Sequence, residues 1–179
     1  LLSVGYGAVM TFFPLFADTI RVNAGTFFLI YAVVLGLVRP IAGNRSDRLG
    51  ESAVYLPAAI ITIAALLTLS AAKGLGGVIL AAVLYGIGIA AAQPALQAAI
   101  LRLVPKERTG VANASLFTAF DLGIATGSMA LGWVAQLLGY RAAFAAGAVS
   151  IALSFAIFAA LVRPRLEAAT QAAAEPAVK

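Results

Sequence analysis

The chain has 179 residues, of which 63% are hydrophobic and only 11% are charged, with a formal net charge of +5. A soluble domain carries about 25% charged residues, so this composition excludes an ordinary soluble protein and makes a lipid bilayer the expected solvent. The chain has no Cys and no His, which excludes thiolate and imidazole chemistry and removes the commonest metal ligand. We therefore expect no catalytic residue, no metal and no cofactor.

Long runs without charge occupy most of the sequence. Each has at least the ~17 residues that a spanning helix needs, and backbone groups in lipid must be paired within their own segment, which favours helices. Two runs are too long for one straight span, so each is expected to include a turn or interfacial residues. The sequence thus predicts an all-α integral membrane protein with six transmembrane helices, at 1–17, 22–38, 52–72, 74–101, 109–140 and 142–162.

Lysine and arginine are distributed unevenly between the two sides that six spans define. Arg21, Lys73 and Arg141 fall on one side, and all the others fall on the opposite side. Because cytoplasmic loops carry an excess of Lys and Arg, we expect the richer side and both termini to be cytoplasmic. This distribution favours membrane orientation over nucleic-acid binding as the meaning of the net charge. The richer side holds Arg39, Arg45, Arg48, Arg102, Lys106, Arg108, Arg163, Arg165 and Lys179.

The two ends of the chain suggest how it is organised. The first apolar run, 1–17, would make a helix of about 25 Å, short of the ~30 Å hydrocarbon core, so we expect the chain to be a fragment of a longer protein. Residues 166–179 are rich in Ala with scattered charges. We expect a transmembrane unit at 1–165 followed by a cytoplasmic tail at 166–179.

A charged segment, RPIAGNRSDRLG at 39–50, separates the second and third spans. Pro40 and Gly43 suit the end of a helix, so a short turn is expected there. The arginines could simply hold this loop in the cytoplasm. Asp47 contributes little to orientation, and it could instead latch an arginine or the positive end of a neighbouring helix. The residues leave both interpretations open.

This segment resembles the G-x-x-x-D-R-x-G loop signature of the major facilitator superfamily. The basic residues that usually follow the last glycine in that family are replaced here by Glu51-Ser52. Three other stretches resemble the seventh, eleventh and twelfth helices of its efflux members: FFPLFA at 12–17, FDLGIATGSMALG at 120–132 and GYRAAF at 139–144. The residues that match the signature are Gly43, Asp47, Arg48 and Gly50, with Arg39-Pro40 matching a pair that precedes it.

The resemblance implies the C-terminal six-helix half of a twelve-helix transporter, most like drug/proton antiporters. Such a half comprises two inverted three-helix repeats, and substrate binds between the halves near the middle of the membrane. The implied partners are the N-terminal half, a small-molecule substrate, a coupling proton and the bilayer, here the bacterial inner membrane, with no nucleic acid. The charged segment would be a conformational gate made of Arg39, Gly43, Asp47, Arg48 and Gly50.

Asp121 is the acid that lies deepest in a predicted span, about 18 Å from the cytoplasmic side at twelve residues of helix. A carboxylate at this depth costs ~2.5–3.5 kcal/mol on insertion scales and usually faces a cavity or a partner. We interpret Asp121 as a proton- or cation-coupling site, and a hydrogen bond that packs two helices is the alternative. Helical periodicity places Asn113, Asp121 and Ser128 on one side, with Gly123 and Gly127 on a separate packing face.

Further polar and aromatic residues suggest a substrate cavity. Gln93 and Gln97 flank Pro94 in the fourth span, where a kink frees backbone groups that polar side chains or water can satisfy. These amides suit a cavity and interhelical hydrogen bonds equally well. Tyr6 could offer an aromatic surface to an apolar substrate, although aromatic residues more often face lipid or core. The candidate cavity thus comprises Tyr6, Gln93, Gln97 and Asn113.

These features predict a secondary active transporter, not an enzyme, that exports small molecules by alternating access coupled to protons. The residues alone are equally compatible with import and with sodium coupling. A six-helix membrane scaffold or assembly protein without transport activity is the alternative. That alternative would account for the Gly-rich packing faces, but it leaves the cost of a central carboxylate unexplained.

Overall fold

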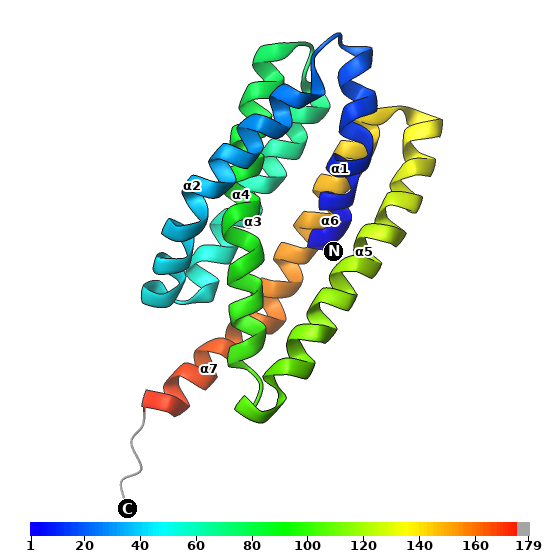
Figure 1. Ribbon diagram of the computed structural model, residues 1–179. Helices are drawn as coiled ribbons and strands as arrows, with labels where there is room; N and C mark the ends of the chain where they lie inside the picture. The colour runs from blue at the N-terminus through cyan, green and yellow to red at the C-terminus, as the bar shows by residue number, and fades with distance from the viewer. Residues whose placement is uncertain (175–179) are drawn as a thin grey trace, which may run out of the picture.

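The computed structural model describes the backbone of residues 1–174 and the side chains of residues 1–46 and 48–168. This part of the chain is almost entirely helical and contains no strand. The helices run up and down as a bundle (Figure 1). A 3-10 turn at Lys106–Arg108 precedes α5, and a π-helical turn at Phe158–Val162 joins α6 to α7. In chain order the helices are α1 (Leu2–Thr19), α2 (Ala24–Leu49), α3 (Glu51–Ala71), α4 (Leu75–Arg102), α5 (Thr109–Leu138), α6 (Tyr140–Ile157) and α7 (Arg163–Ala174).

Most of these helices are suited to a bilayer. Within the described residues, five segments are long and apolar enough to cross a membrane. The 18-residue α1 is not among them, so its crossing of the membrane stays a prediction. The all-α membrane architecture is confirmed, with five of the six predicted spans meeting both criteria. The five are Ala24–Ser46, Glu51–Ala71, Leu75–Arg102, Lys106–Leu138 and Tyr140–Ala168.

The long apolar runs form uninterrupted helices. The 28 residues of α4 and the 30 residues of α5 contain no turn. At 1.5 Å per residue these helices are about 42 and 45 Å long, more than the ~30 Å hydrocarbon core. We expected each of these runs to include either a turn or interfacial residues. Neither helix contains a turn, so the extra residues extend the helix ends toward the bilayer surfaces.

The charged segment is helical, which makes the expected helix end at Pro40 and Gly43 wrong. The α2 helix continues to Leu49. Proline removes one backbone hydrogen bond, but the other backbone groups of a membrane segment still need partners, and continuing the helix provides them. The turn is a single residue, Gly50, with φ +87° and ψ 156°, a conformation that is essentially restricted to glycine.

This extension moves Arg39 out of the surface loop in which we expected it. Arg39 lies ten residues before Leu49, about 15 Å along the helix. It belongs to the candidate span Ala24–Ser46. The bundle therefore carries a cation well inside α2 as well as the carboxylate of Asp121 inside α5.

The connections divide the bundle into two ends (Figure 1). The α1–α2, α3–α4 and α5–α6 connections lie at one end, and the α2–α3 and α4–α5 connections lie with α7 at the other. We call the second the basic end, because it carries more Lys and Arg residues. The first end carries Arg21, Lys73 and Arg141. The helix ends and turns of the basic end carry Arg45, Arg48, Arg102, Lys106, Arg108, Arg163 and Arg165.

The helices α1–α3 and α4–α6 form two groups of three that pack in the same way. A single glycine joins α2 to α3, and a single glycine, Gly139 with φ +84°, joins α5 to α6 at the opposite end of the bundle (Figure 1). The α4 helix packs on α2 and α3 as α1 packs on α5 and α6, while α3 packs on α6. Exchanging α1–α3 with α4–α6 reproduces this set of contacts, which is the pattern of inverted repeats.

Glycines allow the close approach of α1 to α5. A Cβ atom on Gly127 would lie 2.8 Å from the Cα of Val4, and one on Gly123 would meet the side chain of Ser3. The packing face that periodicity predicted for Gly123 and Gly127 is thus confirmed, and α1 is the helix that occupies it. The equivalent α4–α2 contact also depends on a glycine, because a Cβ on Gly86 would lie 2.8 Å from the Cγ1 of Val34.

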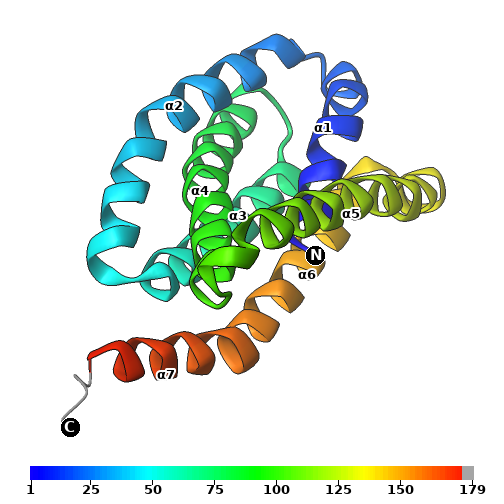
Figure 2. The ribbon, with the colours of Figure 1, turned by 60° about the horizontal axis from the view of Figure 1, so that its bottom comes forward.

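Burial differs sharply among the helices. In an 18-residue apolar stretch of α4, 50% of the residues are buried. The corresponding fractions are 6% for α2 and 11% for α5. The last two lie on different flanks of the bundle, and α7 extends away from it at the basic end (Figure 2). The helices α2 and α5 therefore leave most of their surface uncovered by the rest of the described chain.

Candidate functional site

Asp121 lies in the middle of α5, twelve residues after Thr109. Its side chain is exposed and makes no hydrogen bond or ion pair with any described residue. The helix-packing hydrogen bond that was the alternative interpretation is therefore not what holds Asp121 here. Ser128, on the same side of α5, faces the hydroxyl of Thr11 on α1 at 3.2 Å. This side of α5 is thus polar, exposed at Asp121 and packed against α1 at Ser128.

The predicted amide residues meet between α4 and α5. The side-chain nitrogen of Gln97 donates to the side-chain oxygen of Asn113 at 2.8 Å. Gln93 and Gln97 also line a small pocket whose other walls are apolar and aromatic. The interhelical hydrogen bond is therefore observed for Gln97, which lies at the edge of a pocket, and the role of the amides in a substrate cavity stays a prediction. The pocket is completed by Leu96, Leu116, Phe117 and Phe120.

Tyr6 connects α1 to the same pocket. Its ring centroid lies 5.9 Å from that of Phe120, at a tilt of 52°. Because Phe120 is a wall of the pocket that Gln93 and Gln97 line, the structure brings Tyr6, Gln93, Gln97 and Asn113 into one region. Sequence reasoning assigned each of these residues separately, and the packing of α1, α4 and α5 assembles them.

Two tyrosines that sequence reasoning did not single out extend this region toward α2. The rings of Tyr31 and Tyr85 lie 5.5 Å apart. Tyr85 is 1% exposed, and its hydroxyl has no hydrogen-bond partner among the described residues. A tyrosine within an apolar run carries no sequence signal that separates a site residue from a core residue, so only the packing identifies these two.

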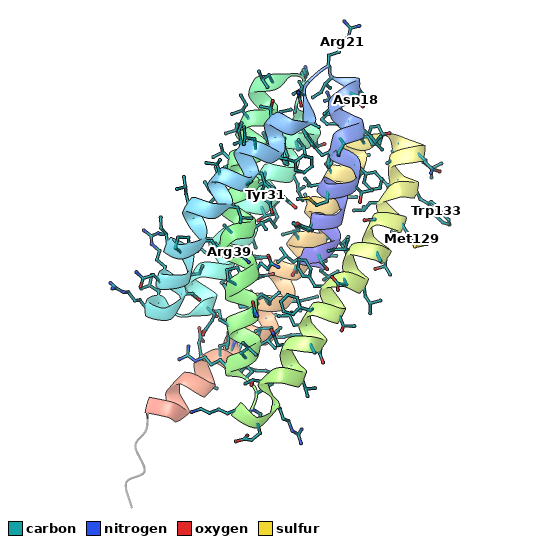
Figure 3. The ribbon with its side chains drawn as sticks, in the orientation of Figure 1. Asp18, Arg21, Tyr31, Arg39, Met129 and Trp133 are labelled. Atoms are coloured by element: carbon teal, nitrogen blue, oxygen red, sulfur yellow. The ribbon has the colours of Figure 1, made fainter. Side chains whose placement is uncertain are left out.

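Arg39 lies on α2 below Tyr31, on the side of the basic end (Figure 3). Its side chain is exposed. It makes no ion pair with any acid whose side chain the structure describes. By contrast, Met129 and Trp133 on the outer side of α5 point away from the bundle and are 76% and 75% exposed, as expected for lipid-facing side chains (Figure 3).

The remaining gate residues occupy the last turns of α2 and its joint. Gly43 faces open space, and Arg48 lies in the last turn, where a cation stabilises the helix dipole. The side chain of Asp47 lies outside the described residues, so its latch stays a prediction.

Sequence reasoning missed an ion pair beside this joint. One guanidinium nitrogen of Arg102, the last residue of α4, donates to both carboxylate oxygens of Glu51 at 3.1 and 3.0 Å. Glu51 is the first residue of α3, so each charge also lies at the helix end that its sign favours. The sequence showed that Glu51 departs from the family's loop pattern. It did not show the partner of Glu51, because Arg102 belongs to a different span.

The fold and the site define a helical membrane protein of two inverted repeats, with polar side chains facing a common region inside the bundle. The family model of the Major Facilitator Superfamily matches residues 1–178, and the chain belongs to this family. A multi-drug resistance efflux pump of Streptococcus pneumoniae is 28% identical over 143 residues, which cover 76% of this chain and 36% of the pump. A protein of Mannheimia succiniciproducens named "Probable sugar efflux transporter" is 31% identical over 140 residues, 78% of this chain and 35% of that protein.

These comparisons establish the family of the chain. The chain spans about a third of the length of the curated relatives that it matches. An integral membrane location agrees with the family and with the apolar helices. The efflux activity in the relatives' names belongs to those proteins.

Proposed function

We propose that this chain is the C-terminal six-helix half of a secondary active transporter that exports small molecules by alternating access, driven by protons. Three features support this proposal: the inverted repeats, the polar region between α1, α4 and α5, and the efflux relatives. Substrate would bind at the open side of this region, against the N-terminal half of the same transporter. The protein would be a transporter without enzymatic activity.

The observation that carries proton coupling is the state of Asp121. It is a carboxylate in mid-helix, exposed on α5 and without a bonding partner among the described residues. An unpaired carboxylate in lipid is unstable, but one that faces a transport cavity can take up and release a proton as access alternates. Asp121 would bind the proton on one side of the membrane and release it on the other.

Transport by the complete protein in vesicles tests this role. We expect Asp121→Asn, which keeps the shape and removes the titratable group, to abolish proton-driven ethidium transport while ethidium still binds. Asp18→Asn is the matched control, because Asp18 is an exposed acid in the last turn of α1. Ethidium accumulation at the wild-type rate by Asp121→Asn would exclude Asp121 as the coupling site. Absence of driven flux in the wild type would favour a scaffold or assembly protein.

The joint between α2 and α3 would act as the conformational gate. Arg39, Gly43, Asp47, Arg48 and Gly50 lie on α2 or at its end, and this helix has most of its surface free to contact the other half. A one-residue joint transmits a tilt of α2 directly to α3. The excess of arginine at the basic end supports placing that end and both termini in the cytoplasm, in the bacterial inner membrane.

A further inference from the structure

We propose that a cavity at the basic end binds the headgroup of a phospholipid with one negative charge, such as phosphatidylglycerol. The cavity has a volume of about 730 Å³, and its walls are the α2–α3 joint, the last residue of α4 and the start of α7. Figure 1 shows these elements together at the basic end. The cavity is separate from the polar region between α1, α4 and α5, so this inference goes beyond the proposed function.

The first argument is the number of hydrogen-bond donors in this cavity. Three helices each contribute one arginine to its lining: Arg48, Arg102 and Arg163. The side chain of Arg48 makes no ion pair or hydrogen bond with any described side chain. Arg102 donates to Glu51 through one nitrogen. Arg163 donates to Glu167 through Nε at 2.7 Å. Two nitrogens of each paired guanidinium therefore remain for another acceptor, and their geometry suits the oxygens of a phosphate.

The second argument is the charge of the lining. It contains three arginines and two carboxylates, which leaves an excess of one positive charge. The α3 helix begins in the same wall, and no described side chain caps its first N–H groups, so the helix dipole adds partial positive charge. A phosphodiester carries one negative charge, which balances this excess. A zwitterionic headgroup is neutral and leaves the excess unbalanced.

The third argument is the apolar surface that continues from the cavity along the bundle. Ala53 and Pro57 of α3 line the cavity and are exposed. Ile60 and Leu67 continue the same face of α3 and are 55% and 50% exposed. Leu161, in the π-helical turn that leads into α7, is 60% exposed. This surface suits the acyl chains of a lipid whose headgroup occupies the cavity, and a soluble phosphate compound has no part that would use it.

The fourth argument is the depth of the cavity. The candidate span of α3 begins at Glu51, so the first turn of this helix lies at a bilayer surface, where lipid headgroups lie. Basic pockets between helices on the cytoplasmic side of a membrane suit anionic headgroups. Membrane orientation alone requires arginines at this end, but it does not require three helices to direct them into one cavity.

Native mass spectrometry of the complete purified protein in a non-ionic detergent tests the inference. Phosphatidylglycerol and phosphatidylcholine with identical acyl chains are the matched probes, because only the first has a net charge. We expect the wild type to bind its first phosphatidylglycerol about tenfold more tightly than phosphatidylcholine, as for a charge-assisted hydrogen bond. Arg48→Gln should remove most of this preference and leave phosphatidylcholine binding unchanged.

Two further variants make this test specific. Glu167→Gln frees Arg163 and raises the excess charge of the lining, so phosphatidylglycerol should bind about threefold more tightly, the range for an exposed charge pair. Misfolding would not produce such a gain. Arg45→Gln is the matched control for Arg48→Gln, since Arg45 is exposed on α2 one turn earlier and lies outside the cavity lining. It should bind phosphatidylglycerol as the wild type does.

Two competitors distinguish a lipid from a soluble phosphate. Glycerophosphoglycerol has the same headgroup without acyl chains, and inorganic phosphate has the charge alone. We expect neither to displace phosphatidylglycerol at millimolar concentrations, and displacement by either would overturn the assignment to a lipid. Equal binding of the two lipids to the wild type, weaker phosphatidylglycerol binding in Glu167→Gln, or an equal loss in Arg45→Gln and Arg48→Gln would overturn the charged site itself.

The proposed function fails separately, because lipid binding is measured without transport. If phosphatidylglycerol binds as expected but ethidium transport is not driven by protons, the transport proposal fails and the lipid site stands. If transport is proton-driven while the wild type shows no lipid preference, only the lipid site is wrong.

Discussion

The helices α2 and α5 occupy equivalent places in the two repeats, and they differ most in the charges they carry. Both pack on the first helix of the other repeat, both end at a single glycine with positive φ, and both leave most of their surface uncovered. Yet α2 carries the cation Arg39 and an internal Pro40, whereas α5 carries the acid Asp121 and no proline. The two repeats therefore have the same helix packing, but the uncovered surfaces of α2 and α5 carry different charges.

This comparison separates two kinds of residue. Glycines at the α1–α5 and α4–α2 contacts and at the two joints maintain the repeat, because any side chain there meets another helix or a forbidden conformation. Charged residues on the flanks are not needed for that architecture. Substitutions at the glycines should therefore change stability in both repeats alike, whereas substitutions at Arg39 and Asp121 should change transport in different ways.

The largest expected effect comes from expressing the chain without the N-terminal half that α2 and α5 are proposed to contact. Residues 1–179 expressed alone should insert into membranes, since each helix pairs its own backbone, but should show no gradient-driven ethidium flux in reconstituted vesicles. Co-expression with an upstream six-helix half should restore part of the flux. Saturable driven flux from this chain alone would instead indicate a self-sufficient unit and would remove the role proposed for the exposed surfaces of α2 and α5.

The two glycine contacts between repeats come next. Gly127→Ala should destabilise the protein by up to about 3 kcal/mol, because its Cβ would press on the backbone of Val4, which cannot move aside. Gly86→Ala should have a similar cost, because its Cβ would meet the branched side chain of Val34 at 2.8 Å and the carbonyl oxygen of Tyr31 at 3.2 Å. Thermal unfolding in detergent measures both. Gly36→Ala is the control, since it faces open space on α2 and should gain about 0.5–1 kcal/mol from helix propensity. Equal effects at Gly127 and Gly36 would contradict the close packing of α1 and α5.

Gly50, between α2 and α3, and Gly139, between α5 and α6, have similar backbone strain. Substituting each tests whether only the α2–α3 joint acts as a gate. Gly50→Ala and Gly139→Ala should each cost about 2 kcal/mol, since both positions have dihedral angles that L-residues rarely adopt. Only Gly50→Ala should also shift the distances between spin labels at the helix ends, as Asp47→Ala should without loss of stability. The same shift in Gly139→Ala would show that the α2–α3 joint is not a special gate.

The sequence predicted the features that depend on composition and helical period. Charge-free runs located the helices, and periodicity placed Gly123 and Gly127 on a packing face that the structure confirms against α1. The charge asymmetry of the two ends also follows directly from the order of the spans. These features are local, because they depend on residues within one helix.

The sequence could not predict what depends on contacts between helices. Pro40 and Gly43 are helix-ending signals in water, and they gave the wrong end for α2 because an apolar solvent makes an interrupted helix more costly. This error hid the depth of Arg39. Gln97 and Asn113 were each identified, but their bond follows from the packing of α4 on α5. The same holds for the meeting of Tyr31 with Tyr85.

The last comparison concerns two arginines, one at each end of the bundle. Arg141, at the start of α6, donates to the carbonyl oxygens of Ser70 and Ala72 at 3.2 and 2.7 Å and lies 5.7 Å from the ring centroid of Phe16. These carbonyls belong to the end of α3, where the helix itself provides no donor. Arg141→Gln should therefore cost about 2 kcal/mol, combining lost hydrogen bonds with a lost cation–π contact.

At the basic end, Arg102→Gln should cost less than about 1 kcal/mol. The side chain of Arg102 is 44% exposed beside Glu51, so water and salt screen the ion pair. Thermal unfolding at low and high salt distinguishes the two ends: added salt should reduce the difference between Arg102→Gln and the wild type but leave that of Arg141→Gln nearly unchanged, because Arg141 binds carbonyl dipoles. The Glu51→Gln variant should match Arg102→Gln, and the double variant should cost no more than either alone, since a single pair is lost. A cost for Arg102→Gln as large as that for Arg141→Gln would mean that the ion pair, rather than the helix-end hydrogen bonds, holds the repeats in register.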